Sequence, residues 1–221
     1  TREVFKTQLL DKQIANFNIS CAVTDKFMEA YSKGEDYDLM DPRTKQSVGK
    51  LNAREVFDEI IDRLSKLSIR LVLTSNGVLI DKHIDSLRKA NIFSINISLD
   101  TLKEKRFASI TKRDDFSSVM RNINLLLENG FDVKINVVLM KDVNDGEIHD
   151  FIEWTKHVNI HVRFIEYMPF EGNDWSWSKI VPYKSILNKI SEKYPVVKLQ
   201  DSKHATSKAY CIKGFQGTFA V

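Results

Sequence analysis

The chain has few cysteines, little excess charge and no long hydrophobic run. Its two cysteines, Cys21 and Cys211, lie far apart without metal-ligand spacing, so we interpret both as small buried residues. With 33 Lys+Arg against 30 Asp+Glu, the net charge of +3 gives no strong attraction to nucleic acid or acidic membranes. No apolar run could span a bilayer, and residues 1–10 lack the apolar centre of a secretory signal. We therefore expect a cytoplasmic protein, or an organelle-matrix protein in a eukaryote, with no nucleic-acid or membrane partner.

From Ala53 onward, helical and strand patterns alternate along the chain. The expected helices are 53–67, 81–90, 116–129 and 145–157, and the expected strands are 70–76, 94–100, 133–140 and 161–168. Strands separated by single helices run parallel, so the pattern predicts an α/β fold, either a barrel-like wall or an open doubly wound sheet. In both architectures, ligands bind beyond the carboxyl ends of the strands.

Composition divides the chain into three segments. Residues 1–52 form a degenerate N-terminal segment, whose polar stretch 33–49 we interpret as a loop or mobile insertion. Residues 53–181 carry the βα core, and residues 182–221 carry a helix near Pro182 and a small β region. Because the chain does not begin with Met, we expect a processed protein or, preferably, a fragment of a longer one.

Polar side chains occupy alternate positions of the four expected strands. Because side chains alternate faces along a strand, each strand presents a one-sided row. The rows are Val72/Thr74/Asn76, Asn96/Ser98/Asp100, Lys134/Asn136/Val138 and Arg163/Ile165/Tyr167. A shared polar interior is the simplest account. Since an unpaired buried cation is costly, an interior that holds Lys134 and Arg163 should also hold carboxylates, water or an anionic ligand.

Each candidate residue also has a structural interpretation. Lys134 fits a solvated lysine at a strand margin, a point-charge contact to phosphate or carboxylate, or a Schiff-base nucleophile. Arg163 favours an anion, because its fixed fork matches phosphate or carboxylate and it cannot act as a base. Thr74 and Ser98 are equally compatible with backbone hydrogen bonds at strand ends, and Met168 with core packing.

Two interpretations concern the segment after the second expected strand. Asp100 could cap the helix that follows as easily as it could contact a ligand. The charged run 103–106 is interpreted as a solvated helix face. A metal site at His157 and His161 is disfavoured, because the residues between them favour leaving the helix.

An ordered set of motifs follows the strand ends. The motifs are LTSNG at 73–77, SINISLDTL at 94–102, FASITKR at 107–113, VKINVVLM at 133–140, VRFIEYMPF at 162–170, VP at 181–182 and KGFQGTF at 213–219. Nearly collinear from about Ala53 to Val221, this set resembles the GTP 3′,8-cyclase family of radical S-adenosylmethionine enzymes, the A proteins of molybdenum cofactor biosynthesis. The resemblance implies a partial (βα) TIM-type barrel of the radical SAM kind over 53–181, incomplete here, followed by the small C-terminal β region.

The resemblance also implies ligands and their contacts. In the family, the lumen holds S-adenosylmethionine on one 4Fe–4S cluster and GTP beside a second. A 5′-deoxyadenosyl radical removes the ribose 3′ hydrogen of GTP, so that C3′ can bond to C8. Carried over by position, Thr74, Lys134 and Arg163 would contact GTP, while Ser98 and Met168 would contact S-adenosylmethionine. No catalytic residue and no metal ligand is carried over.

The sequence departs from this family where the first cluster should bind. The family needs a CxxxCxxC loop, but residues 23–31 keep only its Val-Thr-Asp lead-in, and Cys21 precedes it. The GGEP segment is missing from 47–52, and the chain ends about where the family continues toward its second cluster's cysteines. We therefore expect neither cluster on this chain.

The resulting hypothesis is a GTP 3′,8-cyclase-like protein that is inactive as this chain. The alternative is a non-catalytic nucleotide-binding remnant or pseudoenzyme. Absent barrel strands would expose a sheet edge and favour self-association, for example as a homodimer, or poor solubility. A lysine-dependent lyase acting through Lys134 is a third hypothesis, but no nearby acid/base constellation supports it.

Overall fold

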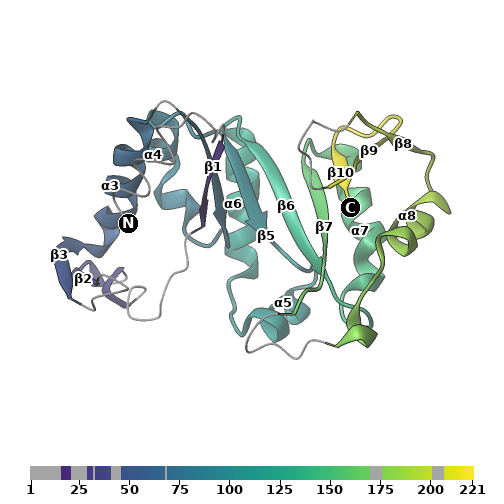
Figure 1. The fold of residues 1–221 in the computed structure, drawn as a ribbon, viewed down its shortest axis with the longest axis horizontal. Helices are drawn as coiled ribbons and strands as arrows, with labels where there is room; N and C mark the ends of the chain where they lie inside the picture. The colour runs from purple at the N-terminus through teal and green to yellow at the C-terminus, as the bar shows by residue number, and fades with distance from the viewer. Residues whose placement is uncertain are drawn as a thin grey trace. The chain divides into compact units, whose positions relative to one another are not determined.

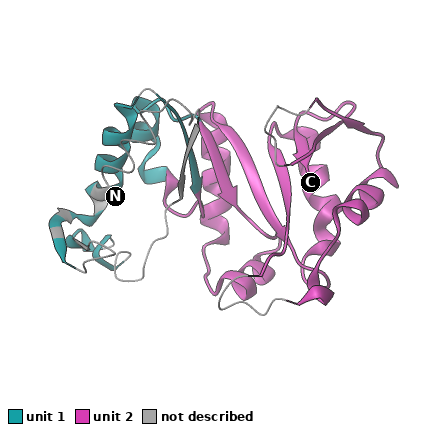
Figure 2. Ribbon diagram, viewed as in Figure 1, with its two compact units in different colours: residues 1–74, 81–93 teal, residues 75–80, 94–221 magenta. Residues whose placement is uncertain are grey.

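The computed structural model describes residues 16–20, 29–31, 33–40, 46–67, 69–169, 176–200 and 207–221. The chain forms two compact units that interleave in sequence, as Figure 2 shows: residues 1–74 with 81–93, and residues 75–80 with 94–221. The predicted segment boundaries after residues 52 and 181 stay a prediction, because they were drawn from composition rather than compactness. Cys21 lies outside the described residues.

The first unit contains two pairs of strands. Strand β1 (Asn16–Ser20) runs parallel to β4 (Arg70–Ser75), and Ser20 lies opposite Thr74. Strands β2 (Asp36–Met40) and β3 (Ser47–Asn52) form an antiparallel ladder. The prediction of a loop or mobile insertion over 33–49 is therefore wrong for 36–40 and 47–49, and residues 41–45 lie outside the described residues. The ladder is made by backbone groups, so charged side chains that face solvent do not prevent it.

Helices of the first unit follow the apolar spacing of the sequence. The long helix is α3 (Ala53–Ser65), and the segment expected over 81–90 forms the 3₁₀ turn η1 (Ile80–Lys82) and the short helix α4 (Ile84–Lys89). Buried His83 lies 2.9 Å from Asp58 through Nδ1 and Oδ1, and its ring centroid is 4.4 Å from that of Phe57. These contacts fix α4 against α3.

The second unit contains a sheet whose first four strands run parallel. Its order is β5 (Ser94–Ser98), β6 (Asp132–Leu139), β7 (His161–Glu166), β10 (Thr218–Ala220), β9 (Ala209–Ile212) and β8 (Val196–Lys198), labelled in Figure 1. The last two strands pair antiparallel, β10 with β9 and β9 with β8. The predicted α/β class with parallel strands is confirmed, and so is the small C-terminal β region.

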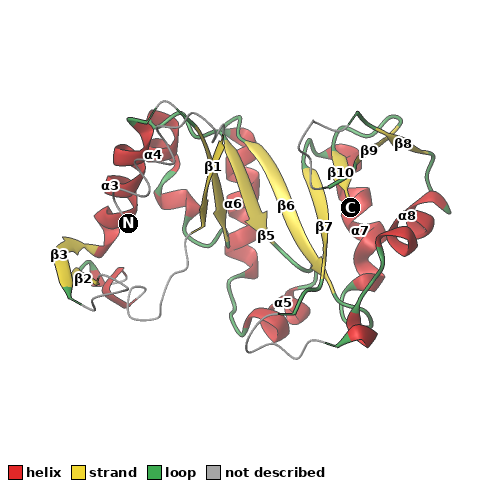
Figure 3. Ribbon diagram, viewed as in Figure 1, coloured by secondary structure: helices red, strands yellow, loops and turns green. Residues whose placement is uncertain are grey.

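Helices connect the parallel strands of this unit (Figure 3). They are α5 (Glu104–Thr111), α6 (Phe116–Glu128), α7 (Ile148–His157) and α8 (Tyr183–Ser191), with 3₁₀ turns η2 (Asp145–Glu147) and η3 (Trp177–Lys179). Helix α6 ends one residue before the predicted limit, and Gly130 follows with φ of 76°, the left-handed conformation that favours glycine. None of the described helices is long and apolar enough to cross a membrane.

The core of the second unit lies between its parallel strands and helices. On β6 one face is fully apolar and buried, formed by Val133, Ile135, Val137 and Leu139. Helix α6 contacts β6, α7 contacts β7, and Val119, Ile123 and Leu126 of α6 are all buried. Each such side chain contributes about 1.5–3 kcal/mol through removal from water. The other face of β6 is only half-buried, so it is the face available to a ligand.

Gly217 allows β10 to join the sheet. Its amide donates a hydrogen bond of 2.8 Å to the carbonyl of Thr155, and the next amide, Thr218, donates to Ile160 at 3.0 Å. A Cβ at position 217 would lie 2.3 Å from the Ile160 carbonyl oxygen. Backbone cannot yield as a flexible side chain can, so only glycine fits this approach.

We expect Gly217→Ala to lower the free energy of unfolding by about 1–3 kcal/mol, the usual cost of overpacking. Urea denaturation measures this change. Gly146→Ala is the matched control, because a Cβ there would meet nothing within 4 Å. Equal stability of the two variants would show that β10 does not depend on the close approach at Gly217.

Candidate functional site

The half-buried face of the parallel strands carries two rows of polar side chains. Register partners across parallel strands project to the same side of the sheet. One row is Asn96, Lys134, His161 and Thr218, and the next is Ser98, Asn136 and Arg163. Lys134 and Arg163 therefore lie on one face, on neighbouring strands and one row apart. The common face that the alternation predicted for them is confirmed.

Arg163 has more donors than partners. Its Nη1 reaches Asn136 Oδ1 at 3.5 Å, the outer limit of a hydrogen bond, and its buried Nε has no partner among the described residues. A guanidinium carries five N–H donors, and a buried donor without a partner costs about 1–3 kcal/mol. An anion beside this side chain would give the guanidinium partners that it lacks.

Lys134 is held weakly at the margin of the same face. Its Nζ lies 3.5 Å from Asp132 Oδ2, and the two side chains are 27% and 55% exposed. Ion pairs with this exposure contribute about 0–1 kcal/mol. Asp132 also accepts a hydrogen bond of 3.1 Å from Ser94 Oγ. The lysine is thus neither buried nor tightly paired, which leaves its charge available.

His161 lies beside Lys134 in register and two residues before Arg163, and its sequence pattern suggested only a disfavoured metal site. Its Nδ1 is 2.7 Å from Thr218 Oγ1. Burial, together with the charges of Arg163 and Lys134, lowers the pKa of His161 to about 4 against an opposing effect of Asp132. The imidazole is therefore neutral at neutral pH. The alternation of side chains along the strand could have identified His161 as a site residue, because His161 and Arg163 are two residues apart on β7 and so share a face.

The low pKa of His161 makes folding stability depend on pH. Since the folded pKa of about 4 lies below the ordinary 6.5, the unfolded chain binds more protons between these values. The free energy of unfolding should fall as pH falls through this window, by up to about 3 kcal/mol. Urea denaturation at several pH values measures the slope.

His161→Asn should flatten this slope, while His157→Asn, which changes an exposed histidine near the end of α7, should leave it unchanged. If the slopes of wild type and His161→Asn coincide, His161 is not the group that is kept neutral.

Asp100 and Asn144 tie together the carboxyl ends of β5 and β6. Asp100 Oδ1 accepts from the Val138 amide at 2.8 Å, and burial raises the pKa of Asp100 against that hydrogen bond. Asn144 Nδ2 donates to the carbonyls of Asp100 and Val138, and Asn144 Oδ1 accepts from the Met140 amide. The interpretation of Asp100 as a helix cap is wrong, because Lys103 occupies that position and the carboxylate turns to β6.

Glu147 anchors the loop that follows β5. Its carboxylate is fully buried and accepts from Thr101 Oγ1 at 2.7 Å, from the Leu102 amide at 2.8 Å and from Arg106 Nη1. Arg106 is therefore an ion-pair partner rather than part of a purely solvated face, as 103–106 was interpreted. No sequence pattern marks Glu147 as buried, because a glutamate beside a glycine in a turn is usually exposed.

The remaining predicted site residues lie at strand ends. Ser98 is exposed at the end of β5, beside Asn136 in register, and Met168 is 60% exposed just beyond β7. Core packing of Met168 is therefore wrong. Thr74 is half-buried on β4 in the first unit, and it is described only within that unit.

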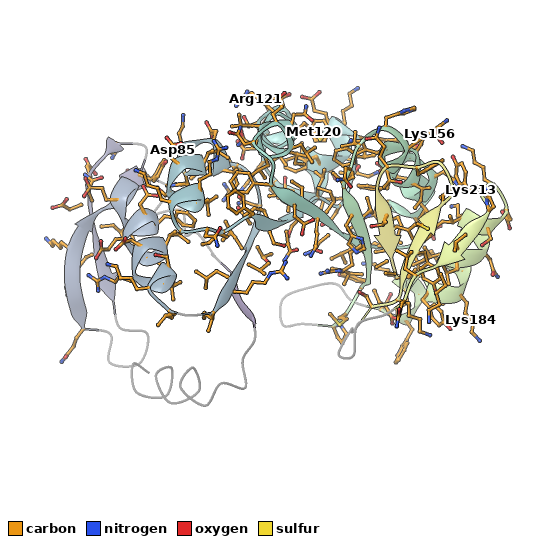
Figure 4. All side chains as sticks on the ribbon, turned by 90° about the horizontal axis from the view of Figure 1, so that it is seen from above. Asp85, Met120, Arg121, Lys156, Lys184 and Lys213 are labelled. Carbon is orange, nitrogen blue, oxygen red and sulfur yellow. The ribbon has the colours of Figure 1, made fainter. Side chains whose placement is uncertain are left out.

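Three other cations of the second unit lie at its periphery. Figure 4 shows Arg121 of α6, Lys156 of α7 and Lys184 of α8 there, and all three are exposed. They provide comparison residues of the same charge.

Within the described part of the chain, no group of three or more His, Cys, Asp and Glu side chains could hold a metal ion. Cys211 is a free, half-exposed cysteine on β9.

Comparison with known proteins identifies two families along the chain. Residues 45–155 match the Radical SAM superfamily, and residues 160–221 match Molybdenum Cofactor Synthesis C. The chain is 39% identical over 174 residues to GTP 3′,8-cyclase, mitochondrial, of Arabidopsis thaliana, covering 77% of this chain and 45% of that one. It is also 39% identical over 172 residues to molybdenum cofactor biosynthesis protein 1 of Drosophila melanogaster, covering 76% and 30%.

The chain spans less than half the length of both relatives. Among solved structures, archaeal TYW1 is similar in fold, with a TM-score of 0.52, 18% identity and coverage of 91% of this chain and 62% of that one. The radical SAM match alone extends over half of the 221 residues and includes β5, β6 and most of α7. The chain belongs to the radical SAM superfamily, whose members use S-adenosylmethionine and 4Fe–4S clusters.

Proposed function

We propose that this chain is a GTP 3′,8-cyclase-type protein of molybdenum cofactor biosynthesis, and that Lys134 and Arg163 bind GTP on the half-buried face of β6 and β7. The names of the Arabidopsis and Drosophila relatives and the C-terminal family match support the assignment. The observation that carries it is the buried Nε of Arg163, which has no partner among the described residues and shares a face with Lys134.

A triphosphate suits this face because its negative charge complements both cations. The guanidinium of Arg163 can donate two parallel hydrogen bonds to one phosphate, and Lys134 adds a compact point charge. Charge-assisted hydrogen bonds of this kind contribute about 1.5–3 kcal/mol each. The proposed contact of GTP with Thr74 rests on the sequence resemblance alone.

S-adenosylmethionine is proposed to contact Ser98 and Met168. Ser98 offers an exposed hydroxyl at the carboxyl end of β5, and Met168 offers an exposed thioether just beyond β7. Ligands of parallel α/β sheets bind at this edge. The network of Asp100 and Asn144 supports the proposal, since it holds the loops of this edge in place.

The residues of this chain do not fit an iron–sulfur cluster of the family kind. Such a cluster needs three thiolates from one short loop, and the sequence contains only Cys21 and Cys211. Cys211 lies on a paired strand rather than in a loop. We therefore derive no radical step for this chain and propose that it binds ligands without turnover on its own. A non-catalytic nucleotide-binding protein is the second candidate function. Binding of GTP in the titration described below would support this candidate as well.

We expect GTP to bind the full chain, and Arg163→Ala to weaken binding by about 10–100-fold, equivalent to about one charge-assisted hydrogen bond. Lys134→Ala should weaken binding less, because a single point charge is lost. Isothermal titration calorimetry measures both. Arg163→Lys separates charge from the fork geometry and should give an intermediate affinity.

Arg121→Ala and Lys184→Ala are the matched controls, because each removes one exposed cation from a helix of the same unit. They should leave GTP affinity within about twofold of wild type, since salt screens exposed charges that do not contact the ligand. Binding that responds equally to all four alanine variants would indicate general charge attraction and overturn the assigned site.

Anaerobic reconstitution with iron and sulfide tests the proposed lack of turnover. We expect no charge-transfer absorption band and no 5′-deoxyadenosine after addition of S-adenosylmethionine and a reductant, because the thiolates for a cluster are missing. The variant with both Cys21→Ala and Cys211→Ala is the control for adventitious iron, because such iron would bind to this variant as well as to wild type. A band that this variant loses, together with 5′-deoxyadenosine from wild type, would refute the proposal.

The predicted homodimer and the cytoplasmic or organelle-matrix location stay predictions from sequence.

A further inference from the structure

The proposed contacts leave out the histidine of the same face. His161 begins β7, and its register partners are Lys134 on β6 and Thr218 on β10. It also lies two residues before Arg163, so both side chains project to the same side of β7. Parallel pairing thus places an imidazole between the two cations that are proposed to bind phosphate.

A hydrogen bond holds the imidazole in place. Nδ1 lies 2.7 Å from Thr218 Oγ1, and Nε2 makes no hydrogen bond to any residue in the described part of the chain. A threonine hydroxyl can donate or accept, so this contact persists whether the ring is neutral or protonated. The second ring nitrogen is therefore free to serve a ligand without loss of the first contact.

The charges around His161 are unbalanced. Arg163 lies on its own strand, and Lys134 and Asp132 lie on β6, while β10 contributes only the hydroxyl of Thr218. His161 thus has two cations and only one carboxylate near it. That carboxylate, Asp132, is 55% exposed and also pairs with Lys134. Burial and this imbalance of charge together disfavour a proton on His161 as long as no anion lies on this face.

We propose that His161 is a third, proton-coupled member of the anion site, neutral in the free protein and protonated when a polyphosphate lies on the face of Lys134 and Arg163. The proposal rests on the proposed function for the identity of the polyphosphate as GTP. The anion would cancel the repulsion from both cations, and Nε2–H of the imidazolium would donate to a phosphate oxygen. The proton comes from solvent, and no bond of the ligand is made or broken.

The lowered pKa of free His161, about 4, is consistent with this proposal, since Arg163 and Lys134 contribute to the lowering after burial. The complex would then bind more protons than the free protein between that value and the higher pKa of the complex. Affinity should therefore rise as pH falls through this window. The largest possible slope for one proton is about tenfold per pH unit.

Calorimetric titration tests the coupling with two probes, GTP and inorganic tripolyphosphate. Titrations in buffers that differ in ionisation enthalpy give the protons taken up per ligand bound, at about pH 6, close to the ordinary pKa of histidine. Both ligands also change their own protonation, so the difference between wild type and His161→Gln is the quantity of interest. We expect wild type to take up more protons and to gain about tenfold more affinity than His161→Gln between about pH 7.5 and 5.5.

His157→Gln is the control histidine, and it should behave as wild type because it is exposed near the end of α7. Histidine ring signals in nuclear magnetic resonance spectra of wild type provide a readout that needs no folded variant. The pKa of His161 should rise on addition of either probe. His161 signals that titrate identically with and without bound ligand would overturn the inference.

The outcomes separate this inference from the proposed function. GTP binding that depends on Arg163, with equal proton uptake in wild type and His161→Gln, removes the inference and leaves the proposed function. Proton uptake at His161 with tripolyphosphate but no binding of GTP leaves the inference and removes the nucleotide assignment. Absence of binding by both probes removes both.

Discussion

Two cations lie on one face of neighbouring parallel strands, and in the described part of the chain a carboxylate pairs with Lys134 but none pairs with Arg163. Register fixes this arrangement, because pairing of β6 with β7 places Lys134 beside His161 and Asn136 beside Arg163. The apolar side chains of the opposite face are buried against helices, so a slip by one residue would turn the whole polar row into the core. Packing on one side of the sheet thus enforces the charge pattern on the other.

The same constraint links the strands to the edge where ligands bind. Asp100 and Asn144 use backbone amides and carbonyls of β5 and β6 as partners, so the loops after these strands are fixed by the register itself. The polar face and its rim are consequently one structure. The C-terminal strands extend it, because β10 joins β7 and supplies Thr218 to His161.

Local patterns predicted the elements of this fold well, but not their partners. Alternation at 133–140 and 161–168 was enough to place Lys134 and Arg163 on one face, since that depends on parity alone. Which residue lies beside His161 depends on tertiary register, so its contact with Thr218, 57 residues away, was hidden. The β2–β3 ladder was missed because its charged residues match a loop in composition, although backbone groups form the pairing.

Buried Glu147 has a consequence for the dynamics of the ligand-binding edge. Its carboxylate receives donors from Thr101, Leu102 and Arg106, all at or near the start of α5. Lifting this segment would leave a charge in the protein interior without compensation, at a cost of several kcal/mol. Opening of the segment on its own is therefore rare. A molecule that approaches the end of β5 would meet a preformed surface, whose recognition does not require local folding.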